Sequence, residues 1–347
     1  KNFSVWKFYM ARVRRIVPAL VALIAVLLIL GWFFLPTPDY QALGSQSAYA
    51  SAFISNIYFW RSSGYFDAAS HEKWLLHTWT LGVEAQFYLL LPLFLMVLWK
   101  IKPAAKTLFW GLLFAFFASL ALSVVASSWR PVPAFYLLPT RGWEFIAGGL
   151  VFFAGRDVKA LEKHSKTLLW SGFVLLLLTF ILIDSSYTWP SAWATLPVLA
   201  TMLIMLAQRP QSIMTAHPIA QWLGDRSYSL YLWHWPIVVA LYFAGLHNDG
   251  LWITAGLAFS LLLGDVSYRL VETPTRMYFS KVSAAKEILG IGALVMLVGV
   301  SAVSARLFVF EGRIPESIDS IANESKNIYA NQSKCISNSD ATNIPID

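Results

Sequence analysis

Histidine and carboxylate side chains interrupt an otherwise apolar sequence at positions where they could move protons. His77 and Glu84 are seven residues apart, so on a helix they share one face, and an imidazole beside a carboxylate suits general acid–base chemistry. Ser227, Tyr231 and His234 follow at i, i+4 and i+7 and form one polar stripe. The sequence predicts His77, Glu84 and His234 as candidate catalytic residues. The alternative is that these side chains only link helices.

Arginines form two further clusters. Arg12, Arg14 and Arg15 precede a long apolar run, and guanidinium groups bind phosphate oxygens in a bidentate manner. This cluster is predicted to hold the phosphates of a cytosolic cofactor; the alternative is an anchor at the membrane surface. Arg141 and Glu144 are three residues apart, a spacing that suits an internal ion pair. With Ser227 and Tyr231, they are predicted to form a polar network that contacts substrate or supports the structure.

Other sequence signals narrow the chemistry. The segment with Asp265 and Glu272, at the cytoplasmic end of the eighth span, is interpreted as a charged helix end; the alternative is a functional role. The remaining histidines lack the spacing of metal ligands, so no metal site is predicted. The sequence also contains no phosphate-binding glycine loop and no nucleophile elbow of the G-x-S-x-G type.

The elements that must position these residues are membrane-spanning helices. The chain is 57% hydrophobic and only 13% charged, whereas soluble domains contain about 25% charged residues. A soluble enzyme and a disordered chain are therefore excluded. Because crossing a bilayer takes about 20 apolar residues, we predict an all-α, polytopic bundle of about nine transmembrane helices. The nine runs are 16–35, 86–99, 107–127, 136–154, 168–184, 190–208, 227–245, 251–268 and 288–308. A tenth stretch, 45–60, is more polar and is assigned as a re-entrant or interfacial helix.

The distribution of positive charge orients this bundle. With residues 1–15 in the cytoplasm and nine crossings, most of the 26 Lys and Arg residues fall in cytoplasmic segments, as expected for a membrane protein. The net charge of +7 therefore needs no nucleic-acid partner. This topology puts the arginines at 12–15 on the inner side and His77 and Glu84 near the outer side.

The last part of the chain has a different composition. Residues 311–347 are polar, rich in Asn and Ser, and show no apolar periodicity. We interpret them as an extracytoplasmic linker that follows a transmembrane domain of residues 1–310. The single cysteine, Cys335, lies in this linker, on the side of the membrane where disulfides form, so its thiol is free or its partner lies beyond residue 347.

The order of the polar motifs resembles the acyltransferase-3 family of integral membrane O-acyltransferases. The matching segments are FYMARVRRIVPAL, SNIYFW, GYFD, WLLHTWTLGVEAQFYLLLPL, RGWEFIAGGL, GDRSYSLYLWHWPI and SYRLVETPTR. Within this family the chain is most similar to the branch that acetylates lipopolysaccharide O-antigen. In that branch a polar linker leads to an extracytoplasmic SGNH hydrolase-like domain, and the segment from Glu311 resembles the linker.

The resemblance implies a reaction and its partners. The donor is acyl-CoA, usually acetyl-CoA, from the cytosol, and the acceptor is a sugar hydroxyl of a cell-surface polysaccharide or a lipid-linked glycan. The location is the bacterial inner membrane, with a periplasmic C-terminus, so membrane lipid is a further partner. The basic motif on the CoA side matches Arg14 and Arg15, and the later polar positions match His77, Glu84, Arg141, Glu144 and His234.

One departure from the family pattern concerns the start of the chain. Family members begin with two further spans, and the first of them carries the histidine usually proposed as catalytic. The resemblance therefore implies that the principal catalytic histidine lies upstream of residue 1 and that residues 1–347 alone are inactive. The alternative function is a transporter or flippase of a lipid-linked or small polar substrate. Such proteins usually contain internal repeats, and this sequence has none.

Overall fold

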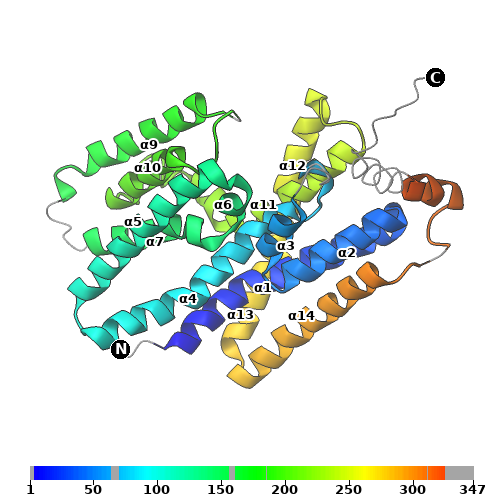
Figure 1. Ribbon diagram of the computed structural model, residues 1–347, viewed down its shortest axis with the longest axis horizontal. Coiled ribbons are helices and arrows are strands. Elements are labelled where there is room, and N and C mark those ends of the chain that lie inside the picture. Colours follow the sequence, from blue (N-terminus) through cyan, green and yellow to red (C-terminus); the bar gives the residue numbers. More distant parts are fainter. Residues whose placement is uncertain (1–3, 64–69, 156–160, 185, 311, 325–347) are drawn as a thin grey trace, which may run out of the picture. The chain divides into compact units, whose positions relative to one another are not determined.

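The computed structural model describes residues 4–63, 70–155, 161–184, 186–310 and 312–324. Within these ranges the chain is built from helices, turns and loops, without a β-strand. The predicted all-α class is therefore confirmed. Long apolar helices dominate the fold (Figure 1).

The helices differ widely in length. The long ones are α1 (Val5–Phe34), α4 (Trp79–Ile101), α5 (Ala105–Trp129), α7 (Leu138–Ala154), α9 (Ser165–Leu182), α11 (Pro218–Phe243), α12 (Gly250–Ser267) and α14 (Ala284–Leu307). The shorter ones are α2 (Thr37–Ser51), α3 (Ser55–Ser62), α6 (Pro131–Tyr136), α10 (Thr195–Leu206) and α13 (Thr273–Lys281). Residues 316–324 are also helical. Three 3₁₀ turns, η1 (Ser70–Glu72), η2 (Leu76–Thr78) and η3 (Ala192–Ala194), and a π-helical turn, η4 (Tyr268–Glu272), complete the elements.

The membrane-protein architecture is confirmed, but the count of nine spans is not. Each of the nine predicted runs coincides with a helix. Six helical segments of the described chain are long and apolar enough to cross a membrane: Val5–Phe34, Leu76–Ile101, Ala105–Trp129, Ser165–Leu182, Gly250–Lys281 and Ala284–Leu307. The helices α7 and α10 have 17 and 12 residues, which is short for a bilayer core. The helix α11 is long enough, but its first half is rich in polar residues.

The chain folds into two compact units. Unit 1 comprises residues 1–12, 53–63 and 77–228, and unit 2 comprises residues 13–52, 64–76 and 229–347. The helices α1 and α11 each contribute residues to both units. In unit 1, α7 packs against α5, and residues of α4, α5 and α7 form a core that includes Leu112, Ile146 and Leu150. The helix α10 packs against α9.

In unit 2, the short helix α2 packs along α14 (Figure 1). A Cβ atom on Gly44 would lie 2.6 Å from the backbone nitrogen of Arg306, so the absence of a side chain lets the two backbones approach closely.

The stretch 45–60 is not one interfacial helix. It contains the end of α2, a break where Phe53 has a φ of 56°, and α3. Much of α2 is buried within unit 2.

The described part of the predicted linker, residues 312–324, is docked onto unit 2. Arg313 donates hydrogen bonds to the carbonyl oxygens of Gly31, Trp32 and Leu35, at 3.0, 2.6 and 2.9 Å. A cation therefore satisfies carbonyls at the C-terminal end of α1. This part of the predicted linker therefore makes specific contacts with unit 2. Cys335 and the rest of the linker lie outside the described residues.

A carboxylate from the same segment binds the start of the next helix. Asp319 accepts hydrogen bonds from the backbone nitrogen and the hydroxyl of Thr37, at 2.7 and 2.8 Å. Thr37 is the first residue of α2, so the negative charge lies at the positive end of the helix dipole. The backbone hydrogen bond, followed by the hydroxyl bond, holds the pKa of the Asp319 carboxyl below its ordinary value of 3.8.

These contacts predict a pH-dependent docking of residues 312–324. Because the pKa is lower in the docked state, the ionised carboxylate stabilises docking above its ordinary pKa, and this contribution is lost as the pH falls through the lowered value. We expect Asp319→Asn to increase amide hydrogen exchange of residues 312–324 at pH 7, and the difference from the wild type to shrink toward pH 3. The exposed Glu316, changed to Gln, is the control. An Asp319→Asn effect that is equally large at pH 3 would contradict the assignment.

Candidate functional site

In unit 1, Arg12 is linked to Glu84 through a single aromatic ring. The Arg12 guanidinium carbon lies 3.5 Å from the centroid of Phe8 and 4.5 Å from that of Tyr88, distances that suit cation–π contacts. The Tyr88 hydroxyl donates a 2.6 Å hydrogen bond to a Glu84 carboxylate oxygen. Tyr9 holds the start of α1 against α4, because its hydroxyl donates to the carbonyl of Leu89 at 2.9 Å.

This arrangement corrects the expectation that Arg12 and Glu84 lie toward opposite sides of the membrane. Tyr88 is one helical turn beyond Glu84 on α4, and it is the residue that meets Arg12. The arginine also has unused hydrogen-bonding capacity. Its Nη1 donates to the carbonyl of Phe8 at 3.2 Å, whereas its buried Nε has no hydrogen-bond partner among the described residues. A buried donor of this kind fits an oxygen of a phosphate or a carbonyl group.

His77 lies in the 3₁₀ turn η2, directly before α4 begins at Trp79. Its angular relation to Glu84 is therefore not that of two residues on one regular α-helix. The side chain is only 7% exposed. The turn is held from α3, because the Ser55 hydroxyl donates to the carbonyl of Thr78 at 2.8 Å. His77 is thus a buried imidazole at a junction that tertiary contacts define.

A fully buried amide locks α3 onto α4 beside this junction. The Asn56 and Gln86 side chains exchange hydrogen bonds, of 2.9 Å to Asn56 Oδ1 and 3.4 Å to Gln86 Oε1. Asn56 also donates to the carbonyl of Tyr136 at 3.2 Å. A Cβ on Gly82 would lie 2.6 Å from Asn56 Oδ1, so only glycine leaves room for the amide. Asn56, from the segment SNIYFW, thus fixes α3 against α4 and against the end of α6.

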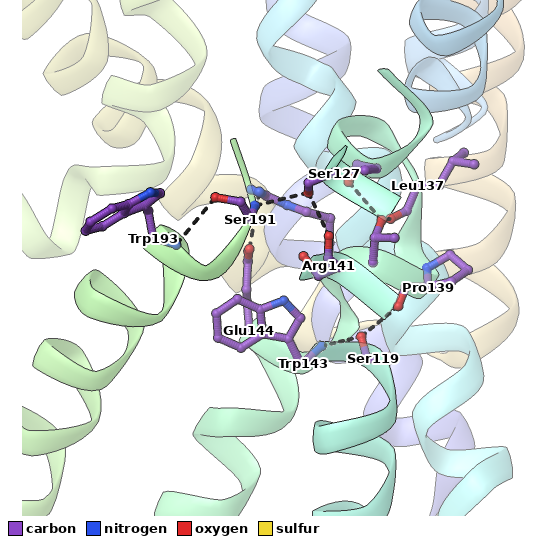
Figure 2. A network of polar contacts seen from close by, with 12 residues as sticks. Ser119, Ser127, Leu137, Pro139, Arg141, Trp143, Glu144, Ser191 and Trp193 are labelled. Carbon is purple, nitrogen blue, oxygen red and sulfur yellow. Dashed lines mark hydrogen bonds and ion pairs between the residues drawn. The ribbon is translucent and has the colours of Figure 1, made fainter. Parts of the chain in front are cut away.

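The predicted pair of Arg141 and Glu144 is formed within α7. Arg141 Nη1 lies 3.2 Å from Glu144 Oε1, and the two side chains are 12% and 22% exposed. The guanidinium carbon also lies 5.3 Å from the ring centroid of Trp79 and 5.8 Å from that of Phe135. Figure 2 shows the pair within a wider set of polar contacts between α5, α7 and the segment around Ser191.

Serines connect the helices around this pair (Figure 2). The Ser119 hydroxyl donates to the carbonyl of Pro139 at 2.7 Å and accepts from the backbone nitrogen of Trp143 at 3.0 Å. It therefore ties α5 to the first turn of α7. Farther along α5, the Ser127 hydroxyl accepts from the backbone nitrogen of Ser191 at 3.1 Å. Ser119 thus holds the backbone on both sides of Arg141, and Ser127 holds the segment around Ser191.

In unit 2, the carboxylate of Glu272 is more buried than its charged sequence segment indicated. Glu272 is 2% exposed and accepts a 2.8 Å hydrogen bond from the Ser229 hydroxyl. Arg276 Nη1 lies 3.9 Å from Glu272 Oε1, and Arg15 is close enough to interact electrostatically. The interpretation of this segment as a charged helix end at the surface is wrong for Glu272. The π-helical turn η4, which ends at Glu272, is a local geometry that often accompanies functional sites.

The predicted arginine cluster divides among three different partners. Arg14 Nε lies 3.2 Å from Glu287 Oε1, at the start of α14, and the Glu287 side chain is 6% exposed. Arg15 is exposed and interacts electrostatically with Glu272. Arg12 contacts Tyr88. Because successive residues of a helix point about 100° apart, neighbouring arginines reach different surroundings. A phosphate would have to compete with a carboxylate for Arg14.

The predicted stripe on α11 is only partly retained. His234 Nδ1 lies 2.7 Å from the carbonyl oxygen of Tyr231. A carbonyl only accepts, so Nδ1 carries the proton and the lone pair of the neutral ring is on Nε2. Ser227 is exposed, whereas Ser229 is buried and bonds to Glu272. Ser229 is thus the serine of this segment that joins the polar contacts of unit 2.

An apolar cavity of about 630 Å³ lies within unit 2. It is lined by α1, α11 and α12, and its lining includes Leu35 near the end of α1 and Val271 beside Glu272. The buried Trp233 Nε1 and Ser267 Oγ, whose residues also line it, have no hydrogen-bond partner among the described residues. The described residues contain no cluster of His, Cys, Asp and Glu that could hold a metal ion.

Glu272, Glu287 and Asn56 were missed as site residues by the sequence reasoning. The signal for Glu272 was present in its charged segment, but the π-helical turn that buries it has no sequence signature. Glu287 lies at the start of a membrane helix, where an acidic residue is equally explained by the helix dipole. Glu84 and Arg12 are brought together within unit 1, and Arg15 and Glu272 within unit 2.

The sequence matches one protein family over residues 1–269, described as an acyltransferase domain. The chain belongs to this acyltransferase-3 family. The match covers the Arg12–Arg15 segment, α4, α7 and α11, so every predicted site residue lies within it. No solved structure matches the chain.

Curated relatives agree with this assignment. Over 80% of its length the chain is 28% identical to the peptidoglycan O-acetyltransferase OatA of Listeria monocytogenes, and the match covers 47% of that protein. The O-acetyltransferase OatA of Staphylococcus aureus is also 28% identical, over 80% of this chain and 48% of its own length. A protein of Komagataeibacter xylinus, named as the membrane-bound transacylase BcsY, is 30% identical over 87% of this chain and 78% of its own length. The chain thus spans about half the length of the OatA relatives.

The geometry of the Arg141–Glu144 pair predicts a non-additive effect on stability. Arg141→Met alone leaves a largely buried carboxylate without its partner, which costs about 3 kcal/mol. We expect the double variant, Arg141→Met with Glu144→Leu, to recover most of this loss, because both charges are then removed. Denaturant unfolding of the detergent-solubilised protein measures the difference. A double variant that is as unstable as the single one would show that the pair is not the stabilising contact.

Proposed function

We propose that this protein is a membrane O-acetyltransferase that moves an acetyl group from cytosolic acetyl-CoA to a sugar hydroxyl. The acceptor is a cell-surface polysaccharide such as lipopolysaccharide O-antigen, or its lipid-linked precursor, and the location is the bacterial inner membrane. The observation that carries this proposal is the family match over residues 1–269. The names of the OatA relatives, which are O-acetyltransferases, support the acetyl group and the glycan acceptor.

The donor side of the proposed reaction uses the arginines at the start of α1. Arg12 offers a buried Nε donor without a partner among the described residues, and Arg15 is exposed beside Glu272. Guanidinium groups of this kind suit the phosphates of CoA. Arg14 contributes positive charge and, through Glu287, fixes α1 to α14. In this proposal the segment 12–15 faces the cytoplasm, in agreement with the positive charge of the neighbouring segments.

The acyl transfer itself needs a base near the acceptor. The base takes the proton of the sugar hydroxyl, the oxygen attacks the acetyl carbonyl carbon, and the carbon–sulfur bond breaks to release the CoA thiolate, which is then protonated. His234 is a candidate for the first step, because the bond from Nδ1 to the Tyr231 carbonyl favours the neutral tautomer in which Nε2 is the basic nitrogen. Glu84 and His77 are further candidates for proton transfer. The apolar cavity of unit 2 offers the acetyl group a route that excludes water.

Loss of His234 should strongly reduce acetylation of the acceptor. We expect mass spectrometry of the surface polysaccharide to show alkali-labile acetyl groups in cells with the full-length gene and none after its deletion. Complementation with His234→Gln should restore about 100-fold less acetylation than the wild type, since general base catalysis contributes at least this much. The matched control is His164→Gln, an exposed histidine at the start of α9.

The glycan measurement also tests the alternative. If polysaccharide acetylation is unchanged after deletion, peptidoglycan and secreted polymers are the next acceptors to analyse. If those are unchanged too, the O-acetyltransferase proposal fails and a transporter or flippase becomes the better explanation.

Donor binding gives an independent prediction. Arg12→Gln and Arg15→Gln should each weaken binding of acetyl-CoA to the full-length protein in detergent about tenfold, as expected for the loss of a hydrogen bond to a charged group. Isothermal titration measures the affinity, with the exposed Arg130→Gln as the control. Unchanged affinity in both variants would remove the arginine segment from the donor site while leaving the acetylation result intact.

A further inference from the structure

A second cavity lies at the ends of α9 and α10 in unit 1, outside the contacts described above. Its volume is about 670 Å³, within the range of small-molecule sites. Three cationic side chains line it: Lys163 and Lys166 at the start of α9, and Arg209 just after α10. The single acidic residue of its lining is Glu162. The family resemblance and the predicted site residues do not account for this cavity.

Cationic side chains outnumber acidic ones in the lining of this cavity, three to one. Within the part of the chain that the structure describes, no ion pair engages Lys163, Lys166 or Arg209. Like charges that line one cavity repel each other, so their proximity costs free energy unless an anion is present. The N-terminus of α9 adds partial positive charge at the same place, since its N-cap residue forms no side-chain hydrogen bond to it. The cavity is therefore built for an anionic group.

The position of the cavity indicates where this anion comes from. The helix α9 is long and apolar enough to cross a membrane, and it begins at Ser165. The apolar helix α10 packs against α9 and ends at Leu206, beside the same cavity. Leu161, Leu206 and Pro210 supply apolar lining next to the cations. A cavity whose lining is both cationic and apolar, at the end of a helix that is long and apolar enough to cross a membrane, matches a lipid phosphate and its glycerol.

We propose that this cavity binds the phosphate headgroup of an anionic phospholipid. Lys163, Lys166 and Arg209 contact the phosphate oxygens, and the apolar lining contacts the glycerol and the first carbons of the acyl chains. The same phosphate chemistry could recognise CoA or inorganic phosphate, but these are water-soluble and gain nothing from an apolar lining at the membrane surface. The site is independent of the proposed acetyl transfer.

The test measures retained lipid on the full-length protein. The protein is reconstituted in vesicles of phosphatidylcholine and phosphatidylglycerol, extracted in mild detergent, and analysed by native mass spectrometry. We expect the variant with Lys163→Gln, Lys166→Gln and Arg209→Gln to retain about tenfold less phosphatidylglycerol than the wild type, because each basic residue at a membrane surface contributes to anionic-lipid binding. Glu162→Gln removes the opposing charge and should increase retention, which separates lost binding from lost folding.

A matched control distinguishes a built site from the general attraction of basic segments to anionic lipid. Lys100, Lys102 and Lys106 are three exposed lysines at the junction of α4 and α5, and their triple change to Gln removes the same charge. Equal loss of phosphatidylglycerol in both triple variants would overturn the proposal. Displacement of the lipid by millimolar CoA or inorganic phosphate would overturn the lipid assignment, since the cavity would then hold a soluble phosphate.

Discussion

The cost of placing charge within apolar helices governs the polar structure of this protein. An ionisable side chain in a membrane helix is expensive unless a partner or water compensates it. The described structure meets this constraint by pairing. Arg14 is paired with Glu287, Arg141 with Glu144, and Glu272 lies close to Arg276. The Arg14–Glu287 pair joins α1 to α14, whereas the other two pairs neutralise charge between neighbouring turns of one helical segment.

Helix ends impose a second constraint of the same kind. The corner between α1 and α2 leaves carbonyl groups at the end of one helix and an N–H group at the start of the next. Arg313 and Asp319 satisfy these from a single segment that follows α14. The tail is thereby tied to the membrane domain by groups that the helix dipoles attract.

The chemistry of the candidate site depends on these constraints. A guanidinium group with a buried donor, such as Arg12, is tolerated because two aromatic rings hold it through cation–π contacts. His234 is held in one tautomer by a backbone carbonyl. The proposed acetyl transfer needs cations for the donor phosphates and a neutral base for the acceptor hydroxyl. Both residue types are present, and each is oriented by neighbours on its own unit.

The sequence by itself determined the helical membrane class, the approximate position of every long helix, the family, and the pairing of Arg141 with Glu144. These follow from apolar runs and from spacing within one helix, which are local properties of the chain. Only the tertiary structure decided that Tyr88 joins Arg12 to Glu84, that Ser229 rather than Ser227 contacts Glu272, and that Arg313 and Asp319 dock the tail. Helices that are apolar on most sides carry little information about which face meets which neighbour, so these contacts depend on packing between distant segments.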